Sequence, residues 1–158
     1  MRRRKKKYFD RGIDTPTAIE VAITRRLQFS EVDALAIAWH GRYMAFFEEA
    51  ANELGQMIGL TYAAYRDAGV GAPIAQIHVD YHRPLLLDQK FTVTATLIWS
   101  EAARLNTEYR IVNELNECVA TGYTIQMFYD LTSREPFWLT PELVQQMKKR
   151  WKDGAFNG

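Results

Sequence analysis

The pattern of apolar and polar residues along the chain predicts several strands and one long helix. Apolar residues fill alternate positions from residue 19 to residue 29, which is typical of a strand with one buried face. Arg25 interrupts this apolar series. From Tyr43 onward the apolar residues recur at helical spacing as far as Ile58, and Gly59 then provides a helix stop signal. The first half of the chain therefore predicts a strand followed by a long helix.

Four further segments alternate in the same way, and they are residues 76–82, 91–99, 103–112 and 118–129. Their connections are short and only one face of each is apolar, which favours an antiparallel sheet. A short second helix is expected over residues 61–68, and Thr140-Pro141 begins a final helix over residues 143–151. This order predicts an α+β domain in which an antiparallel sheet of about five strands wraps around one long central helix, with an added C-terminal helix.

Composition narrows the class of protein. The 158 residues suit one domain, and 20 Lys and Arg against 19 Asp and Glu give a net charge of +1, which disfavours nucleic-acid binding through bulk charge. The run Arg2–Lys7 is basic like the start of a signal peptide, but a polar segment follows it instead of an apolar one. We therefore expect a mobile tail over residues 1–17 and a single domain over residues 18–158. No apolar run is long enough for a membrane helix. We therefore expect a cytoplasmic protein with neither a nucleic-acid nor a membrane partner.

The sequence just before and at the start of the long helix reduces the number of folds that fit this order of elements. It reads Asp33-Ala34-x4-Trp39-His40-x2-Tyr43 and continues into Phe46-Phe47-Glu48, while a later segment reads Val79-Asp80-Tyr81-x2-Pro84. In their order and spacing these motifs resemble the hotdog-fold acyl-CoA thioesterases of the 4-hydroxybenzoyl-CoA thioesterase family. The resemblance covers residues 19–129 and implies the hotdog fold for the sheet and helix predicted above.

The resemblance also implies roles for individual residues. Asp33 would be the catalytic carboxylate, either as a nucleophile or as a general base that activates water. The backbone N–H of His40 would point at the thioester oxygen, and Trp39 and Tyr43 would line the substrate pocket. Glu48 is a second candidate carboxylate on the long helix. The residues alone favour another interpretation, in which Asp33 caps the helix approach or a turn, since Asp is favoured at both places.

One part of the motif departs from the family pattern. Leu35 and Ala36 stand where the family has small glycine positions, and Arg42 replaces the usual Asn before the Tyr. Glycine adopts backbone conformations that other residues take up less easily. The loop between Asp33 and the long helix is therefore expected to have a different shape from that of the family.

The resemblance implies hydrolysis of an acyl-CoA or acyl-carrier-protein thioester, with coenzyme A as part of the substrate and no other cofactor. The alternatives are a non-catalytic acyl-CoA-binding hotdog protein and a hotdog dehydratase of hydroxyacyl thioesters. The resemblance further implies a homodimer or homotetramer with its site at the protomer interface. Coenzyme A phosphates would be held there by surface arginines, for which the candidates are Arg83, Arg104 and Arg110.

A metal site is the disfavoured alternative. His78, Asp80 and His82 share one face of a predicted strand, and histidines two positions apart do bind metals in strands. We nevertheless expect no metal.

Overall fold

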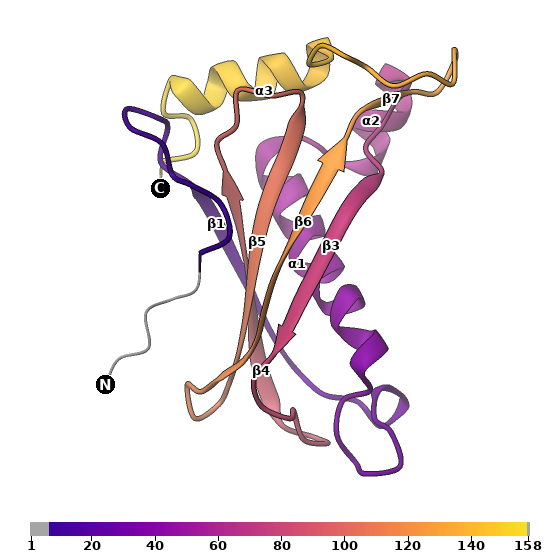
Figure 1. Ribbon diagram of the computed structural model, residues 1–158, viewed down its shortest axis with the longest axis vertical. Helices are drawn as coiled ribbons and strands as arrows, with labels where there is room; N and C mark the ends of the chain where they lie inside the picture. Colours follow the sequence, from indigo (N-terminus) through magenta and orange to yellow (C-terminus); the bar gives the residue numbers. More distant parts are fainter. Residues whose placement is uncertain (1–6, 158) are drawn as a thin grey trace.

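The computed structural model describes residues 7–157, which form a curved antiparallel sheet with a long helix on one face (Figure 1). The five strands are, in spatial order, β1 (Ile19–Arg26), β4 (Lys90–Ile98), β5 (Arg104–Asn113), β6 (Cys118–Met127) and β3 (Ile74–Tyr81). Helix α1 (Tyr43–Ile58) lies along the inner face of this sheet. The predicted arrangement of sheet and central helix is thus confirmed.

Smaller elements complete the domain. Two short 3-10 helices, η1 (Phe29–Glu31) and η2 (His40–Arg42), flank the loop that leads into α1. Helix α2 (Tyr62–Ala68) follows α1, and helix α3 (Glu142–Lys152) crosses the upper end of the sheet. Strands β2 (Val70–Gly71) and β7 (Tyr129–Asp130) pair with each other in a second, two-stranded sheet.

The core forms where α1 presses against the inner face of the sheet. Phe46 and Phe47 of α1 are fully buried, and Phe47 stacks on Tyr109 of β5 with ring centroids 4.4 Å apart. The helix approaches β6 closely because Gly122 has no side chain to hold it off: a Cβ atom there would lie 2.7 Å from the Phe47 ring. Phe46 packs on Phe91 of β4 with ring centroids 5.0 Å apart, so the two adjacent phenylalanines contact different strands.

Several element boundaries differ from those predicted. Strand β1 ends at Arg26 rather than Phe29, because the chain turns into η1 and leaves the Phe29 side chain 82% exposed. At α3 the N-cap is Pro141, one residue later than predicted. Arg25, which broke the apolar series of β1, lies on the inner face and is half-buried beside Phe46.

The N-terminal segment contacts the outer face of the sheet. The backbone N–H groups of Tyr8 and Phe9 donate to the Glu108 carboxylate at 2.7 and 2.9 Å, and Arg11 forms an ion pair with it at 2.8 Å. From Tyr8 onward, the segment predicted as a mobile tail therefore packs against β5. Residues 1–6 of the predicted tail lie outside the described part of the chain. Within residues 7–157, no helix is both long and apolar enough to cross a membrane.

Candidate active site

Asp33 lies in a tight turn between η1 and η2. The turn is closed by a bridge between Val32 and Ala38, and the Asp33 backbone N–H donates to the Ile37 carbonyl at 2.9 Å. The Asp33 Oδ1 accepts the backbone N–H of Leu35 at 2.8 Å, so this carboxylate caps its own turn. Within residues 7–157 no hydrogen bond to Oδ2 is present, and the side chain is half-buried. Asp33 can therefore cap its turn with Oδ1 and still have Oδ2 available for a reaction.

Leu35 and Ala36, two of the three residues that depart from the family pattern, form the tip of this turn. Ala36 has a φ of 58°, the left-handed conformation that glycine adopts without cost. Its carbonyl accepts the backbone N–H of Leu87 at 3.0 Å, and the Ala38 N–H donates to the Leu85 carbonyl at 2.8 Å. These bonds attach the turn to the connection between β3 and β4, which holds Ala36 in its unfavourable conformation.

The start of the helix presents a free backbone donor. Within residues 7–157 the backbone N–H of His40 has no hydrogen-bond acceptor, as expected for the first turn of a helix. The His40 ring is exposed and lies 5.0 Å from the Trp39 ring, which is itself 48% exposed. Gly41 leaves room for that indole, because a Cβ atom would lie 2.3 Å from it. The positive end of the helix dipole and a free N–H thus meet at this point.

Two tyrosines fix the helix start against the edge strand. Tyr81, at the end of β3, donates its hydroxyl to the His40 carbonyl at 2.7 Å, and its ring meets the buried Tyr43 ring edge-on at 4.8 Å. Burial raises the pKa of Tyr43 to about 12, so its hydroxyl is protonated at neutral pH. Tyr81 belongs to the Val79-Asp80-Tyr81 motif, but no role of its own was predicted for it. Its alternate position in β3, on the face opposite His78 and Asp80, was the available signal.

A cavity of about 720 Å³ opens between α1 and the inner face of the sheet. It begins beside Gly41 and Met44 at the start of α1. Most of its lining is apolar, and the aromatic and aliphatic part of that lining includes Phe47, Leu54, Ile58, Tyr65, Ile77 and Leu105. Glu48 is the carboxylate of this lining, and its Oε1 accepts the Tyr62 hydroxyl at 3.3 Å. Asp33 does not line the cavity within one protomer.

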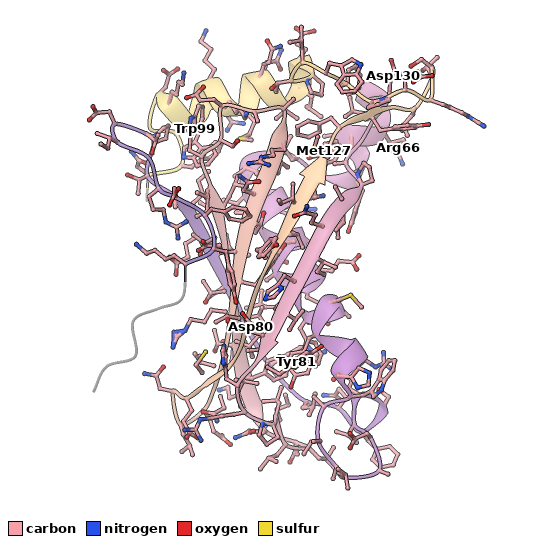
Figure 2. All side chains as sticks on the ribbon, viewed as in Figure 1. Arg66, Asp80, Tyr81, Trp99, Met127 and Asp130 are labelled. Carbon is pink, nitrogen blue, oxygen red and sulfur yellow. The ribbon has the colours of Figure 1, made fainter. Side chains whose placement is uncertain are left out.

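The predicted phosphate-binding arginines lie in different places. Arg83 follows β3, is exposed, and pairs with Glu117 at 3.2 Å. Arg104 begins β5 opposite Met127, which Figure 2 shows at the other end of the sheet from Tyr81. Because side chains alternate along a strand and Leu105 lines the cavity, Arg104 and Arg110 face outward. The structure therefore brings Asp33, Trp39, His40 and Tyr43 to one end of the sheet, and it does not bring Arg104 there within one protomer.

The three residues considered for a metal site make other contacts. His78 Nε2 lies 3.1 Å from Asp80 Oδ2, and His82 Nε2 lies 2.9 Å from Thr121 Oγ1. In the described part of the chain, no group of three or more His, Cys, Asp or Glu side chains is arranged to hold a metal ion. The expectation that no metal is needed stays a prediction.

Known proteins resemble this chain in sequence and in structure. Residues 27–147 match the sequence model of the thioesterase-like superfamily. A curated protein of Aquifex aeolicus is 37% identical over 73 residues, which are 46% of this chain and only 57% of the relative's own length. The acyl-CoA thioester hydrolase YbgC of Escherichia coli is 23% identical over 124 residues, or 78% of this chain and 92% of that protein.

The fold has close counterparts among solved structures. The DHNA-CoA thioesterase from Staphylococcus aureus superimposes with a TM-score of 0.77 and 23% identity, over 88% of this chain and 93% of that one. At this level of identity the likeness establishes the shared fold alone. That fold is the hotdog fold expected from the sequence.

Proposed function

We propose that this chain, which belongs to the thioesterase-like superfamily and is an acyl-CoA thioester hydrolase, cleaves its substrate with Asp33 and the backbone N–H of His40. One observation carries the proposal. Within residues 7–157, Asp33 has one carboxylate oxygen without a hydrogen-bond donor, and the His40 backbone N–H has no acceptor. The two groups flank the same short turn, which leads into the helix start beside the apolar cavity.

The two groups suit the two halves of thioester cleavage. Attack on the thioester carbonyl moves negative charge onto its oxygen, and a free N–H at a helix N-terminus stabilises that charge by about 3 kcal/mol in the transition state. Collapse of this intermediate breaks the carbon–sulfur bond and releases the coenzyme A thiolate. The acyl group leaves as the carboxylic acid.

Asp33 can supply the attacking oxygen in either of two ways. As a nucleophile, its carboxylate forms an acyl anhydride and expels the thiolate, and water then hydrolyses the anhydride. As a general base, it takes a proton from a water molecule that attacks the carbonyl directly. Both routes consume one water and regenerate the carboxylate, so both fit the same overall reaction.

The acyl group would occupy the cavity beside α1, whose lining is mainly apolar. Trp39 and Tyr43 do not line this cavity within one protomer, but they stand on either side of Gly41, where the cavity begins, and would form the wall of its entrance. The coenzyme A part would remain at the surface, where the exposed guanidinium of Arg83 could exchange its ion pair with Glu117 for one with a phosphate. An acyl-carrier-protein thioester is the other candidate substrate, and no cofactor beyond the substrate's own coenzyme A is invoked.

A second copy of the chain would complete the site. Strand β3 pairs only with β6 in the described residues, and this edge exposes the apolar side chains of Ile74, Ile77 and Tyr81. Exposed edges of this kind are usually covered by pairing or association. We therefore expect a homodimer, or a homotetramer built from two such pairs, with the site at the protomer interface. Only in such an assembly could Arg104 contribute to coenzyme A binding, because within one protomer it lies at the other end of the sheet. Light scattering that finds only monomers would contradict this.

The test is release of free thiol from short, long and aromatic acyl-CoAs and from an acyl carrier protein. We expect Asp33→Asn to lower kcat/KM by at least about 100-fold on the best substrate. Glu48→Gln is the matched control, because it neutralises a carboxylate that lines the cavity, and it should cost much less. If Glu48→Gln abolishes turnover while Asp33→Asn does not, Glu48 is the catalytic carboxylate. A wild-type chain that binds acyl-CoA but releases no thiol would instead be a binding protein.

A further inference from the structure

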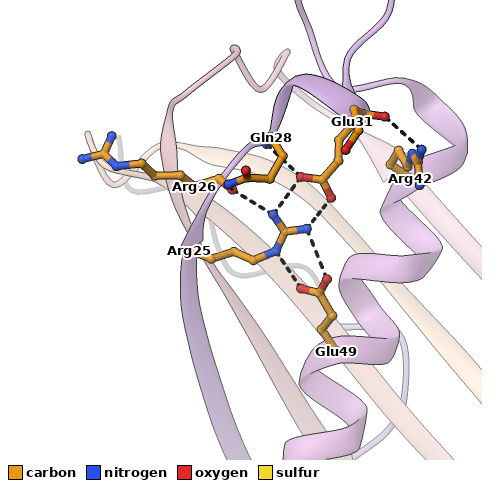
Figure 3. Close-up of polar contacts among 7 residues, drawn as sticks. Arg25, Arg26, Gln28, Glu31, Arg42 and Glu49 are labelled. Carbon is orange, nitrogen blue, oxygen red and sulfur yellow. Dashed lines mark hydrogen bonds and ion pairs between the residues drawn. The ribbon is translucent and has the colours of Figure 1, made fainter.

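Arg25 of β1 pairs with carboxylates from two other segments (Figure 3). Its Nε donates to Glu49 of α1 at 2.8 Å, and its Nη1 donates to Glu31 of η1 at 2.8 Å. Its Nη2 contacts the second oxygen of each carboxylate. One planar guanidinium therefore fastens a strand, a helix and the segment before Asp33 together.

The pairing is partly shielded from water. The Arg25 and Glu31 side chains are only 26% and 11% exposed, and the guanidinium carbon lies 5.0 and 5.1 Å from the ring centres of Phe46 and Phe91. The hydrogen bonds that Arg25 donates to Glu31 hold the pKa of Glu31 below its usual value and raise the pKa of Arg25. Bidentate, shielded pairs hold their geometry better than exposed surface pairs do.

Glu31 connects this cluster to both ends of the Asp33 turn. It stands two residues before Asp33 in the chain, and its backbone carbonyl accepts the N–H of Trp39 at 2.9 Å, one residue before His40. Its carboxylate also accepts the N–H of Gln28 at 2.8 Å. A displacement of Glu31 would therefore move the entry and the exit of the turn together.

We propose that Arg25 is a positioning residue, which holds Glu31 against Glu49 and thereby fixes the Asp33 carboxylate relative to the His40 N–H. This inference rests on the proposed function of those two groups. Arg25 is not one of the residues that line the cavity, and within residues 7–157 it makes no hydrogen bond to the Asp33 side chain. It therefore acts through Glu31 and α1. A positioning role predicts a loss in the chemical step with little change in substrate affinity.

The first comparison is between Arg25→Met and Arg26→Met. Arg26 is the next residue of β1 and is exposed, and within residues 7–157 its side chain donates only to the Asp88 carbonyl. We expect Arg25→Met to lower kcat by about 10- to 100-fold with KM within about twofold, because small misplacements of reacting groups cost this much. Arg26→Met should leave both constants unchanged.

Conservative variants keep the proposal falsifiable if Arg25→Met folds poorly. Arg25→Lys retains the charge but cannot form the planar fork to two carboxylates, so kcat should recover only part of the loss. Glu49→Gln should lower kcat about 3- to 10-fold, because the link to α1 is weakened while Glu31 stays paired. All variants are assayed well below their unfolding temperatures, which circular dichroism establishes.

The decisive measurement is the effect of Arg25→Met in an Asp33→Asn background. If Arg25 acts by positioning Asp33, its loss should cost much less there than in the wild type, whereas a loss of folded protein would cost the same in both. Equal losses in the two backgrounds, or an Arg25→Met variant with wild-type kcat, would overturn the inference alone. A fully active Asp33→Asn variant would overturn the proposed function and this inference with it.

Discussion

Gly122 of β6 is the position where α1 and the sheet come closest, and Gly122→Ala tests that contact. A Cβ atom at this position would lie 2.2 Å from the His78 carbonyl oxygen of the neighbouring strand and 2.7 Å from the Phe47 ring. Both distances are far below van der Waals contact. The carbonyl belongs to a backbone held in the β3–β6 ladder, so it cannot rotate away as a side chain would.

The cost follows from this geometry. Overpacking a well-packed core typically destabilises a protein by about 1–3 kcal/mol, and a fixed backbone neighbour places this case near about 3 kcal/mol. In a domain of this size, 1 kcal/mol shifts the unfolding temperature by about 2–4 °C, so we expect Gly122→Ala to unfold about 6–12 °C earlier. Because Phe47 lines the cavity, its displacement should also raise KM for the acyl substrate.

The assay is thermal unfolding followed by circular dichroism, with Gly71→Ala as the control. The nearest atom to a Cβ at Gly71 is the Cδ2 of Leu131 at 3.2 Å, the end of a flexible and half-exposed side chain. That variant should unfold within about 3 °C of the wild type. If Gly122→Ala unfolds at the wild-type temperature, α1 does not pack on β6 as described.

Three further predictions concern stability. Thr61→Ala removes the side chain that accepts the Ala64 N–H at 3.0 Å and caps α2. The free energy of unfolding in urea should fall by about 1 kcal/mol, and an unchanged value would refute the cap. The Arg25 hydrogen bonds lower the pKa of Glu31, so the stability that ionised Glu31 gives the fold is complete above its ordinary pKa of 4.5 and is lost as pH falls through the lowered value. Glu31→Gln should therefore be less stable than the wild type at pH 7, and its free energy of unfolding should fall less on acidification. Burial raises the pKa of Tyr43 from 10.0 to about 12. The stability that the protonated hydroxyl gives the fold is therefore complete below pH 10 and is lost as pH rises through about 12. Tyr43→Phe should therefore flatten the alkaline limb of the stability profile, and an unchanged limb would contradict the burial of this hydroxyl.

The fold was predictable because its signals are local. The helical spacing from Tyr43 to Ile58 matches the observed bounds of α1, and each alternating segment became a strand with shifts of only a few residues. The same holds for the turn at Asp33 and the helix start at His40, whose spacing is set within one short stretch. The spacing of apolar residues within each segment was therefore enough to predict most of the helices and strands.

The contacts that the sequence did not reveal join distant segments. Arg25 looked like an interruption of β1, because its partner Glu49 lies 24 residues further along the chain. The contact between Arg11 and Glu108 spans 97 residues, so nothing near the N-terminus signalled that this segment packs on the sheet. Arg104 was selected for its charge and strand position, and only the register of β5 reveals which end and face it occupies.

The most direct test of the central claim is a single-turnover measurement with enzyme in excess over the acyl-CoA that turns over best. This arrangement isolates bond cleavage from product release. We predict that Asp33→Asn binds the acyl-CoA with wild-type affinity and releases its thiol at least about 100-fold more slowly than the wild type. A variant that cleaves the bound thioester at the wild-type rate would contradict the assignment of Asp33 as the catalytic carboxylate.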